Sequence, residues 1–223
     1  MDFSALHLTL RLAALTTALL LCVAVPLAAW LAEKATLARR LVQAVVALPL
    51  VLPPTVLGFY LLVGMGPTTV LGRAYIAVMG HTLAFTFPGL VVGSMVYSLP
   101  FAVQPLTVAF AGVPESLREV ARVLGATPWV VFRRVTLPLA KQGLLTAAIL
   151  TFAHTVGEFG VVLMLGGDIP GSTRTASIAI FDRVQEGNYA AANRMSVALI
   201  ALSFVALLVV YARGMWRKES QLG

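Results

Sequence analysis

The sequence predicts an all-α polytopic membrane protein with about five transmembrane helices, and three observations indicate this. Of the 223 residues, 59% are hydrophobic and only 11% are charged, which is too apolar for a soluble domain. The mean hydropathy is +0.92. The charges gather in a few short segments between long charge-free stretches. We therefore expect residues 1–223 to form one transmembrane domain.

The first two charge-free stretches predict spans at 9–32 and 41–64. A helix needs about 20 apolar residues to cross the ~30 Å of hydrocarbon in a bilayer. Basic residues follow the first stretch instead of preceding it, so we interpret it as an uncleaved helix and not as a signal peptide. Pro49, Pro53 and Pro54 lie in the second stretch. Because proline removes a backbone donor, this helix should kink or break there.

The third charge-free stretch, 74–114, is long enough for one span or for two. Two crossings would place the basic segments on opposite sides of the membrane. One crossing places them all on the cytoplasmic side, as the positive-inside rule favours. We therefore expect one span at 83–106, with short flanks at the interfaces.

The remaining stretches predict span four at 143–165, interrupted by Glu158, and span five at 195–213. The polar, turn-rich segment 166–194 between them should face outward and contain a short amphipathic helix at 177–184. This topology puts the N-terminus outside and the C-terminus in the cytoplasm. The last span should end at an aromatic and basic anchor formed by Arg213, Trp216, Arg217 and Lys218. The cytoplasmic segments then carry the whole net charge of +7, so the basic pI does not require a nucleic acid partner.

The charged segment at 114–138 cannot rest in hydrocarbon and forms the main cytoplasmic loop. Pro114 fits the start of a helix, Gly125 its end, and Pro128 the start of a second short helix. The apolar residues of the first helix repeat on one face: Leu117, Val120, Ala121 and Leu124. Because a helix of about ten residues is marginal alone in water, either the membrane ends of this chain or a cytoplasmic partner should cover that face.

Glu119, Val120 and Ala121 are followed after three residues by Gly125, and nine residues later comes the sequence 135–138, VTLP. This pattern resembles the cytoplasmic signature of ATP-binding cassette (ABC) importer permeases, EAA, three residues, G, nine residues, I, one residue, LP. The two valines are mild departures. The resemblance implies the type I ABC importer fold, in which this loop is a coupling helix seated in a cleft of the ATPase subunit. The coupling residues that it implies are Glu115, Glu119, Ala121, Arg122, Leu124, Gly125, Leu137 and Pro138.

Two further stretches narrow the resemblance. Residues 48–62, LPLVLPPTVLGFYLL, and 154–175, HTVGEFGVVLMLGGDIPGSTRT, are similar to the molybdate permease subunits of these importers, in which a GEFG element precedes I-P-G-x-T-R. Sulfate and tungstate permeases share much of this framework, and Asp168 stands where an asparagine is expected. The resemblance therefore implies an oxyanion substrate, molybdate first, with tungstate and sulfate as alternatives.

A path for an oxyanion should offer hydroxyls and backbone donors without tight binding. The candidates in or at the edge of the predicted spans three and four are Thr82, Thr86, Ser94, Thr151 and Thr155. Each of these hydroxyls could equally bond to its own backbone or to a neighbouring helix.

Glu158 is an ionisable group within a span and is therefore a functional hypothesis by default. Since a carboxylate would repel an anion, we expect it to hold the outer gate by pairing with a cation such as Arg174. The alternative is a carboxylate that reaches interfacial water. Asp168 and Arg174 lie in the external segment, where a binding protein would dock.

Three other side chains have simpler interpretations. His81 and His154 are expected to be polar contacts between helices, because no second metal ligand stands at a chelating spacing. Cys22 lies in an apolar stretch and is expected to be a small buried side chain.

The chain contains no nucleotide-binding loop of the form GxxxxGK[ST] and no pattern of catalytic residues. We therefore expect a non-catalytic subunit that binds no cofactor, with ATP and Mg on a partner. Five spans are few to enclose an aqueous path, which favours a pair of permeases. The expected partners in the inner membrane are a second copy, two ATPase subunits, an external oxyanion-binding protein and lipid, but no nucleic acid. A secondary anion transporter, or a membrane enzyme or scaffold, remains as an alternative class.

Overall fold

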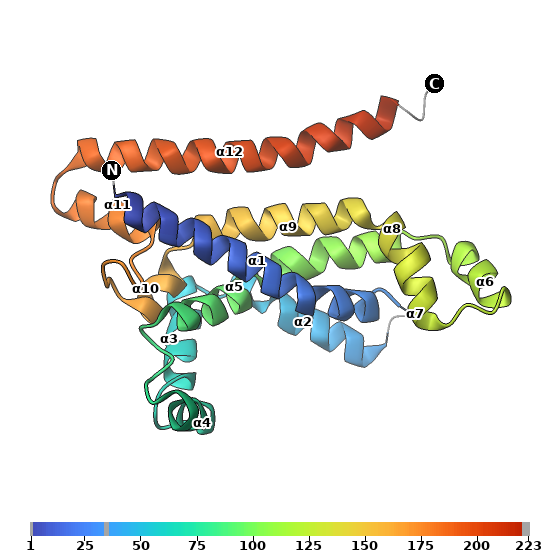
Figure 1. Cartoon of the computed structure of the whole chain (residues 1–223), viewed down its shortest axis with the longest axis horizontal. Helices are drawn as coiled ribbons and strands as arrows, with labels where there is room; N and C mark the ends of the chain where they lie inside the picture. The colour runs from blue at the N-terminus through green and yellow to red at the C-terminus, as the bar shows by residue number, and fades with distance from the viewer. Residues whose placement is uncertain (1, 34–35, 220–223) are drawn as a thin grey trace.

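The computed structural model describes residues 2–33 and 36–219 and, within them, all side chains except those of 206 and 209–219. Three helices lie side by side at the centre of the molecule: α1 (Phe3–Leu31), α5 (Phe87–Ala111) and α9 (Lys141–Val156) (Figure 1). Their buried contacts are mostly small or aliphatic, among them Ala24, Ala28, Ala102 and Ala147. Small residues let helix backbones approach closely in a membrane. A Cβ at Gly143 would lie only 2.1 Å from the Cβ of Ala109, so α5 and α9 nearly touch there.

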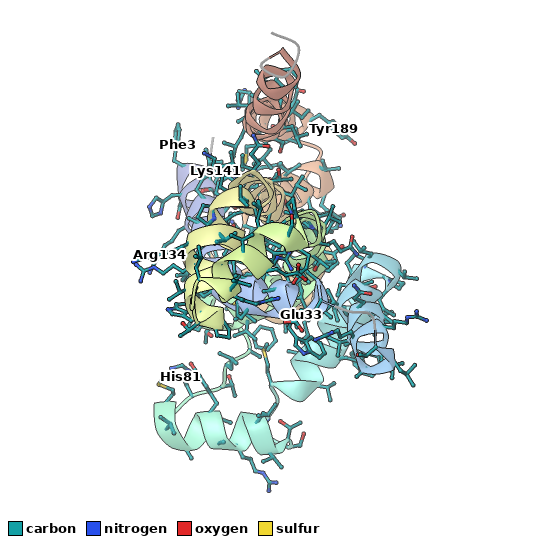
Figure 2. All side chains as sticks on the ribbon, turned by 90° about the vertical axis from the view of Figure 1, so that its right-hand side faces the viewer. Phe3, Glu33, His81, Arg134, Lys141 and Tyr189 are labelled. Atoms are coloured by element: carbon teal, nitrogen blue, oxygen red, sulfur yellow. The ribbon has the colours of Figure 1, made fainter. Side chains whose placement is uncertain are left out.

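The second predicted span is two helices, α2 (Leu37–Val51) and α3 (Pro54–Gly64), bent by 113° at their junction. The break falls at Leu52 and Pro53, as the prolines predict, because proline cannot donate the next helical hydrogen bond. Helix α3 turns away from the bundle and leads into α4 (Val70–Met79). Helix α4 forms the segment before α5 that was expected to be a short flank at the interface. Together α3 and α4 form a projecting arm (Figure 1). Figure 2 shows His81 on this arm, far from Tyr189 on the opposite side of the molecule.

The fourth predicted span is also divided. Helix α9 ends at Val156, and α10 (Gly160–Gly166) begins after Gly157, Glu158 and Phe159. The two broken helices meet at their breaks, since a Cβ at Gly160 would lie 2.7 Å from the Cβ of Pro54. A Cβ at Gly58 would likewise lie 2.8 Å from the Cβ of Met164. Helices α3 and α10 therefore pack as one unit.

Two helices follow α10. Helix α11 (Ala176–Gln185) confirms the short helix expected at 177–184, and its first backbone N–H donates to the hydroxyl of Thr9 on α1 over 2.8 Å. Helix α12 (Tyr189–Glu219) then runs back along the whole bundle and stands apart from it over much of its length (Figure 1).

Length and composition allow two of the described helices, α1 and α5, to cross a membrane individually. Up to four spans result if the bent pair α2–α3, and the segment 128–139 together with α9, each count as one. In α12, the apolar stretch Tyr189–Val205 is shorter than the helices that can cross a membrane individually. The side chains of the anchor Arg213, Trp216, Arg217 and Lys218 lie outside the described residues. Five spans and their boundaries therefore remain a prediction.

Candidate functional site

The charged loop 114–138 folds into short helices at one end of the molecule (Figure 1). They are α6 (Glu115–Val123), α7 (Pro128–Val131), the π-helical turn η1 (Phe132–Thr136) and α8 (Leu137–Leu139). The helix starts expected at Pro114 and Pro128 are confirmed to within one residue. The π-helical turn is closed by the N–H of Leu137, which donates to the carbonyl of Phe132. Since Pro138 has no N–H to continue the regular ladder, the chain passes through one wider turn before it.

Gly125 ends the first helix of the loop, as the sequence predicts. Its φ is +82°, in the left-handed region that residues with a Cβ adopt only with strain. Its N–H donates to the carbonyl of Arg122 over 2.9 Å, and the N–H of Ala126 donates to that of Ala121 over 3.0 Å. The glycine of the signature is thus required by the turn between α6 and α7.

The apolar face of α6 is uncovered. No residue of this helix is buried, and Leu117, Val120 and Leu124 are 45%, 58% and 80% exposed. Glu119 is exposed as well, while Ala121 is half-buried. The membrane ends of the same chain, one of the two partners expected for this face, therefore do not cover it in this structure. At the end of the loop Leu137 is half-buried and Pro138 exposed.

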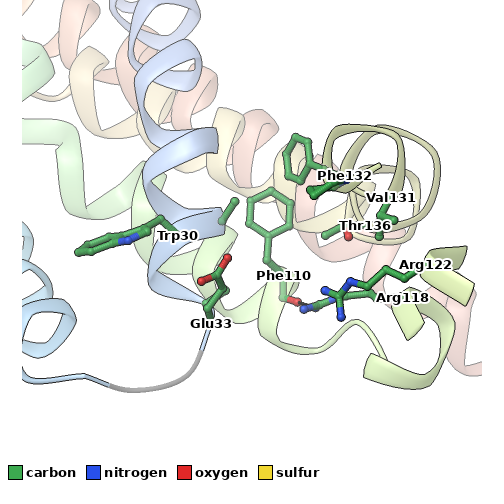
Figure 3. A pocket seen from close by; sticks show the side chains of 11 residues that line it. Trp30, Glu33, Phe110, Arg118, Arg122, Val131, Phe132 and Thr136 are labelled. Atoms are coloured by element: carbon green, nitrogen blue, oxygen red, sulfur yellow. Dashed lines mark hydrogen bonds between the residues drawn. The ribbon is translucent and has the colours of Figure 1, made fainter. Parts of the chain in front are cut away.

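The polar face of α6 turns toward the bundle. Arg118 donates from Nη2 to the carbonyls of Phe110 and Val113, over 2.5 and 3.1 Å. Glu115 accepts from Nη1 of Arg118 over 3.2 Å and from Nη1 of Arg122 over 2.8 Å. Behind these arginines lies a pocket of about 240 Å³, with Phe110 and Phe132 among the residues on its other side (Figure 3). Sequence reasoning assigned Arg122 to the coupling set and missed Arg118.

Three of the predicted path residues, Ser94, Thr151 and Thr155, lie at the interface of α5 and α9. All three are buried, at 0–2% exposure, so they do not border an open cavity in this structure. Thr155 donates to the carbonyl of Thr151 over 2.9 Å and lies 3.0 Å from the hydroxyl of Ser98. Among the residues that the structure describes, the hydroxyls of Ser94 and Thr151 find no hydrogen-bond partner.

Ser98 and His154 complete this polar interface. The Ser98 Oγ lies 2.9 Å from Nδ1 of His154, which also stacks on Phe101 with ring centroids 4.0 Å apart. His154 is thus a polar contact between helices, as predicted. Ser98 was not predicted, although its place four residues after Ser94 sets both hydroxyls on one face of the helix and could have indicated it.

The other two path candidates are not within a span. Thr86 is the N-cap of α5, where its hydroxyl donates to the carbonyl of Leu83 over 2.6 Å and accepts from the N–H of Gly89. Thr82 lies in the loop before α5, with its hydroxyl 3.3 Å from the carbonyl of Ala84. The span was expected to begin near 83, which would put Thr86 inside it and Thr82 at its edge. Helix α5 begins at Phe87, where Pro88 fits the first turn.

Glu158 does not form the predicted pair with Arg174. It sits in the break between α9 and α10 and is 3% exposed, and within the described part of the chain neither carboxylate oxygen has a hydrogen-bond partner. The Ser94 hydroxyl is close enough to interact with it, without the geometry of a hydrogen bond. Arg174 pairs instead with Asp168, which lies in the same loop and is therefore nearer. Because Glu158 is buried, its carboxylate does not reach interfacial water in this structure, so that alternative is ruled out as well.

The loop 167–175, which joins α10 to α11, carries a compact ion cluster. Arg174 donates from Nε and Nη2 to the two oxygens of Asp168, the latter over 2.7 Å, and lies 3.7 Å from Asp182 on α11. The hydrogen bond from Arg174 lowers the pKa of Asp168, whereas partial burial raises the pKa of Asp182. Thr173 fixes the loop, since its buried hydroxyl donates to the carbonyl of Gly166 over 2.6 Å. Asp168 and Arg174, both predicted to face a binding protein, are thus brought together.

Two further expectations are wrong. His81 is not a contact between helices, because its Nδ1 lies 2.9 Å from the neighbouring Thr82 carbonyl and its ring packs on Tyr75 of α4. Cys22 is exposed on α1 and not buried. Both errors concern which helices are neighbours, which local sequence does not specify.

Residues 24–216 match the protein family described as binding-protein-dependent transport system inner membrane component. The chain belongs to that family. The chain is 54% identical to the molybdenum transport system permease protein ModB of Azotobacter vinelandii, over 95% of this chain and 93% of the relative. It is 39% identical to ModB of Escherichia coli K12, over 81% and 80% of the two chains.

The fold is likewise that of known ABC transporter chains. A chain of the MetNI methionine ABC transporter in an inward-facing conformation aligns with a TM-score of 0.73 at 20% identity, covering 95% of this chain and 94% of that one. A chain of a bacterial alginate ABC transporter, in complex with an alginate-bound periplasmic protein, aligns with a TM-score of 0.74 at 19% identity, covering 93% and 76%. The expected all-α importer permease fold is therefore confirmed.

Proposed function

We propose that this chain is the permease subunit of an ABC importer that moves molybdate across the inner membrane. An external binding protein would deliver the oxyanion, and a partner ATPase would supply the energy. The uncovered apolar face of α6 carries the proposal, because it combines the signature spacing with three exposed apolar side chains at one end of the bundle. A partner surface of matching shape would bury that face.

The substrate assignment depends on the relatives. ModB of Azotobacter vinelandii, at 54% identity, is named for molybdenum transport, as is ModB of Escherichia coli. Tungstate and sulfate remain the competing oxyanions, because a tetrahedral dianion offers the same oxygens to the same donors. This chain would bind neither ATP nor Mg, both of which belong to the partner ATPase.

The path would lie between two copies of the chain. The hydroxyls that could have lined it within one copy are buried between α5 and α9, so one copy encloses no open polar route at that interface. Two copies, two ATPase subunits and one binding protein make the expected complex. The N-terminus and the loop with Asp168 and Arg174 would face outward, and α6 with the C-terminus would face the cytoplasm.

The substrate can be tested by uptake of labelled molybdate into cells that depend on this chain, with tungstate or sulfate as competitor. We expect competition by tungstate and little by sulfate at equal concentration. Sulfate that competes as well as unlabelled molybdate would contradict the molybdate assignment.

The energy source can be tested separately through α6. We expect an ATPase subunit to co-purify with the wild-type chain and to be lost from a Leu124→Glu variant, because a carboxylate would be buried in the contact. The thermal unfolding of the variant permease should be unchanged, since Leu124 is 80% exposed in the chain alone. Uptake by the purified permease in liposomes without ATPase or nucleotide would favour a secondary transporter.

A further inference from the structure

Helix α6 is attached to the membrane bundle in an unusual way. No residue of this helix is buried, so apolar packing does not hold it against the end of α5. A pocket of about 240 Å³ separates its polar face from Phe110 and Phe132 (Figure 3). Its orientation must therefore depend on other contacts.

One side chain bridges this gap. Arg118 is 15% exposed, and its Nη2 reaches the carbonyls of Phe110 and Val113, over 2.5 and 3.1 Å. In the described residues, no second side chain of α6 has a hydrogen bond to α5 or to the linker that follows it. Glu115 accepts from the other end of the same guanidinium over 3.2 Å. Arg118 thus ties the start of α6 to the end of α5.

The chemistry of this contact suits a rigid joint. The last carbonyls of a helix lack partners within the helix and carry a partial negative charge, which a cation stabilises. A planar guanidinium offers several donors in a fixed geometry, so it can hold two carbonyls and a carboxylate at once. Lysine has the same charge but places it on a single flexible group.

The backbone gives α6 a second, longer connection. It runs through α7, η1 and α8 into α9, and Phe132 of η1 packs edge-on against Phe110 with ring centroids 5.7 Å apart. That connection links α6 to α9 and not directly to α5. The covalent linker between α5 and α6 contains Gly112, and its buried Val113 anchors the chain just before Pro114. Without Arg118, α6 could pivot at Pro114 while the linker stays in place.

We propose that Arg118 is the positioning residue that makes α6 and the cytoplasmic end of α5 move as one body. When the ATPase displaces α6, the guanidinium transmits that displacement to α5 and so to its polar interface with α9. This role depends on the proposed importer function. It assigns the side chain of Arg118 to transmission, whereas the apolar face of α6 serves ATPase binding.

The matched variants are Arg118→Ala, Arg118→Lys and, as control, Arg134→Ala. Arg134 lies on η1 in the same loop and carries the same charge, but it is exposed and extends away from the body (Figure 2). The assembled complex is placed in liposomes with the binding protein and labelled molybdate. The readouts are the ATPase rate with and without loaded binding protein, and the molybdate transported per ATP hydrolysed.

We expect Arg118→Ala to lower the stimulation of ATPase by loaded binding protein by about tenfold, the size expected for losing hydrogen bonds from a charged donor. The unstimulated rate and the ATPase content of the purified complex should remain. Arg118→Lys should recover part of the loss, and Arg134→Ala should resemble the wild type. An equal loss in Arg118→Ala and Arg134→Ala would overturn the proposal, because it would show a general effect of charge.

A distance measurement on the permease alone tests the joint without transport. Spin labels at cysteines replacing Val108 on α5 and Val123 on α6, both exposed, are introduced in a Cys22→Ser background. The distance distribution should broaden with Arg118→Ala and stay narrow with Arg134→Ala. An unchanged distribution would contradict the positioning role of Arg118, even if the complex transports molybdate. A complex that moves no molybdate, with the distribution broadened as expected, would instead contradict the proposed function alone.

Discussion

At the scale of single residues, the acidic groups of Asp168 and Glu158 differ in what surrounds them. Asp168 is partly exposed and holds Arg174 through two hydrogen bonds. Glu158 is buried in a helix break with no cation beside it in the described part of the chain. A buried charge is costly unless it is paired. The ionised carboxylate of Asp168 therefore stabilises the fold, whereas that of Glu158 destabilises it.

We predict that Glu158→Gln leaves the thermal unfolding temperature in detergent unchanged or raises it. The amide has nearly the same shape and costs less to bury than a carboxylate without a partner. Asp168→Asn is the matched comparison and should lower the temperature, because it removes an ion pair. A clear loss of stability in Glu158→Gln would show that its carboxylate makes a favourable contact, as the gate hypothesis requires.

We predict that the coupling between Asp168 and Arg174 depends on pH only in acid. Because Arg174 lowers the pKa of Asp168, this carboxylate stabilises the fold at every pH above its unfolded value of about 3.9, and the contribution is lost as the pH falls through the folded value. A double-mutant cycle with Asp168→Asn and Arg174→Gln should give about 0.2–1 kcal/mol between pH 5 and 8.

The partly buried Asp182, whose pKa is raised, acts in the opposite sense and lies 3.7 Å from Arg174, so the cycle is measured in an Asp182→Asn background. A coupling energy that already declines between pH 7 and pH 5 would contradict this assignment.

At the scale of helices, close approaches at glycine and breaks at proline determine how the elements pack. The junction of α2 and α3 meets the start of α10 where Gly160 contacts Pro54. Helices α5 and α9 meet where Gly143 faces Ala109. Since lipid is as apolar as the core, such close backbone contacts contribute much of the packing between membrane helices.

We predict that Gly143→Ala destabilises the fold by about 1–3 kcal/mol, because its Cβ would overlap that of Ala109. The double change Gly143→Ala with Ala109→Gly should recover part of the loss by removing one of the two methyl groups. Gly64→Ala is the control, since nothing lies within 4 Å of a Cβ at that position of α3. Unfolding free energies in detergent decide the outcome, and equal effects of Gly143→Ala and Gly64→Ala would contradict the close approach.

At the scale of the whole molecule, the two ends of the bundle differ in charge and in shape. The end with α6 and α7 carries several basic side chains, and Figure 2 shows Arg134 extending away from the body there. The opposite end carries the compact ion cluster of the loop 167–175. This asymmetry is the basis of the proposed orientation in the membrane.

We predict the sidedness of two exposed serines in intact cells. In a Cys22→Ser background, a cysteine replacing Ser172 of the outer loop should react with a membrane-impermeant maleimide. A cysteine replacing Ser116 of α6 should react only after the cells are made permeable, because the excess of basic residues keeps that loop inside. The reverse labelling pattern would invert the topology.

The sequence alone determined the membrane class, the break near Pro53, the turn at Gly125 and the coupling signature. Each follows from a local rule: composition decides solubility in lipid, proline lacks a donor, and glycine accepts a positive φ. Only the tertiary structure decided the partner of Arg174, the exposure of Cys22, the meeting of Ser98 with His154, and the contact of Arg118 with the end of α5. These depend on which helices become neighbours and on competition between nearby partners, and no local pattern in the chain specifies either.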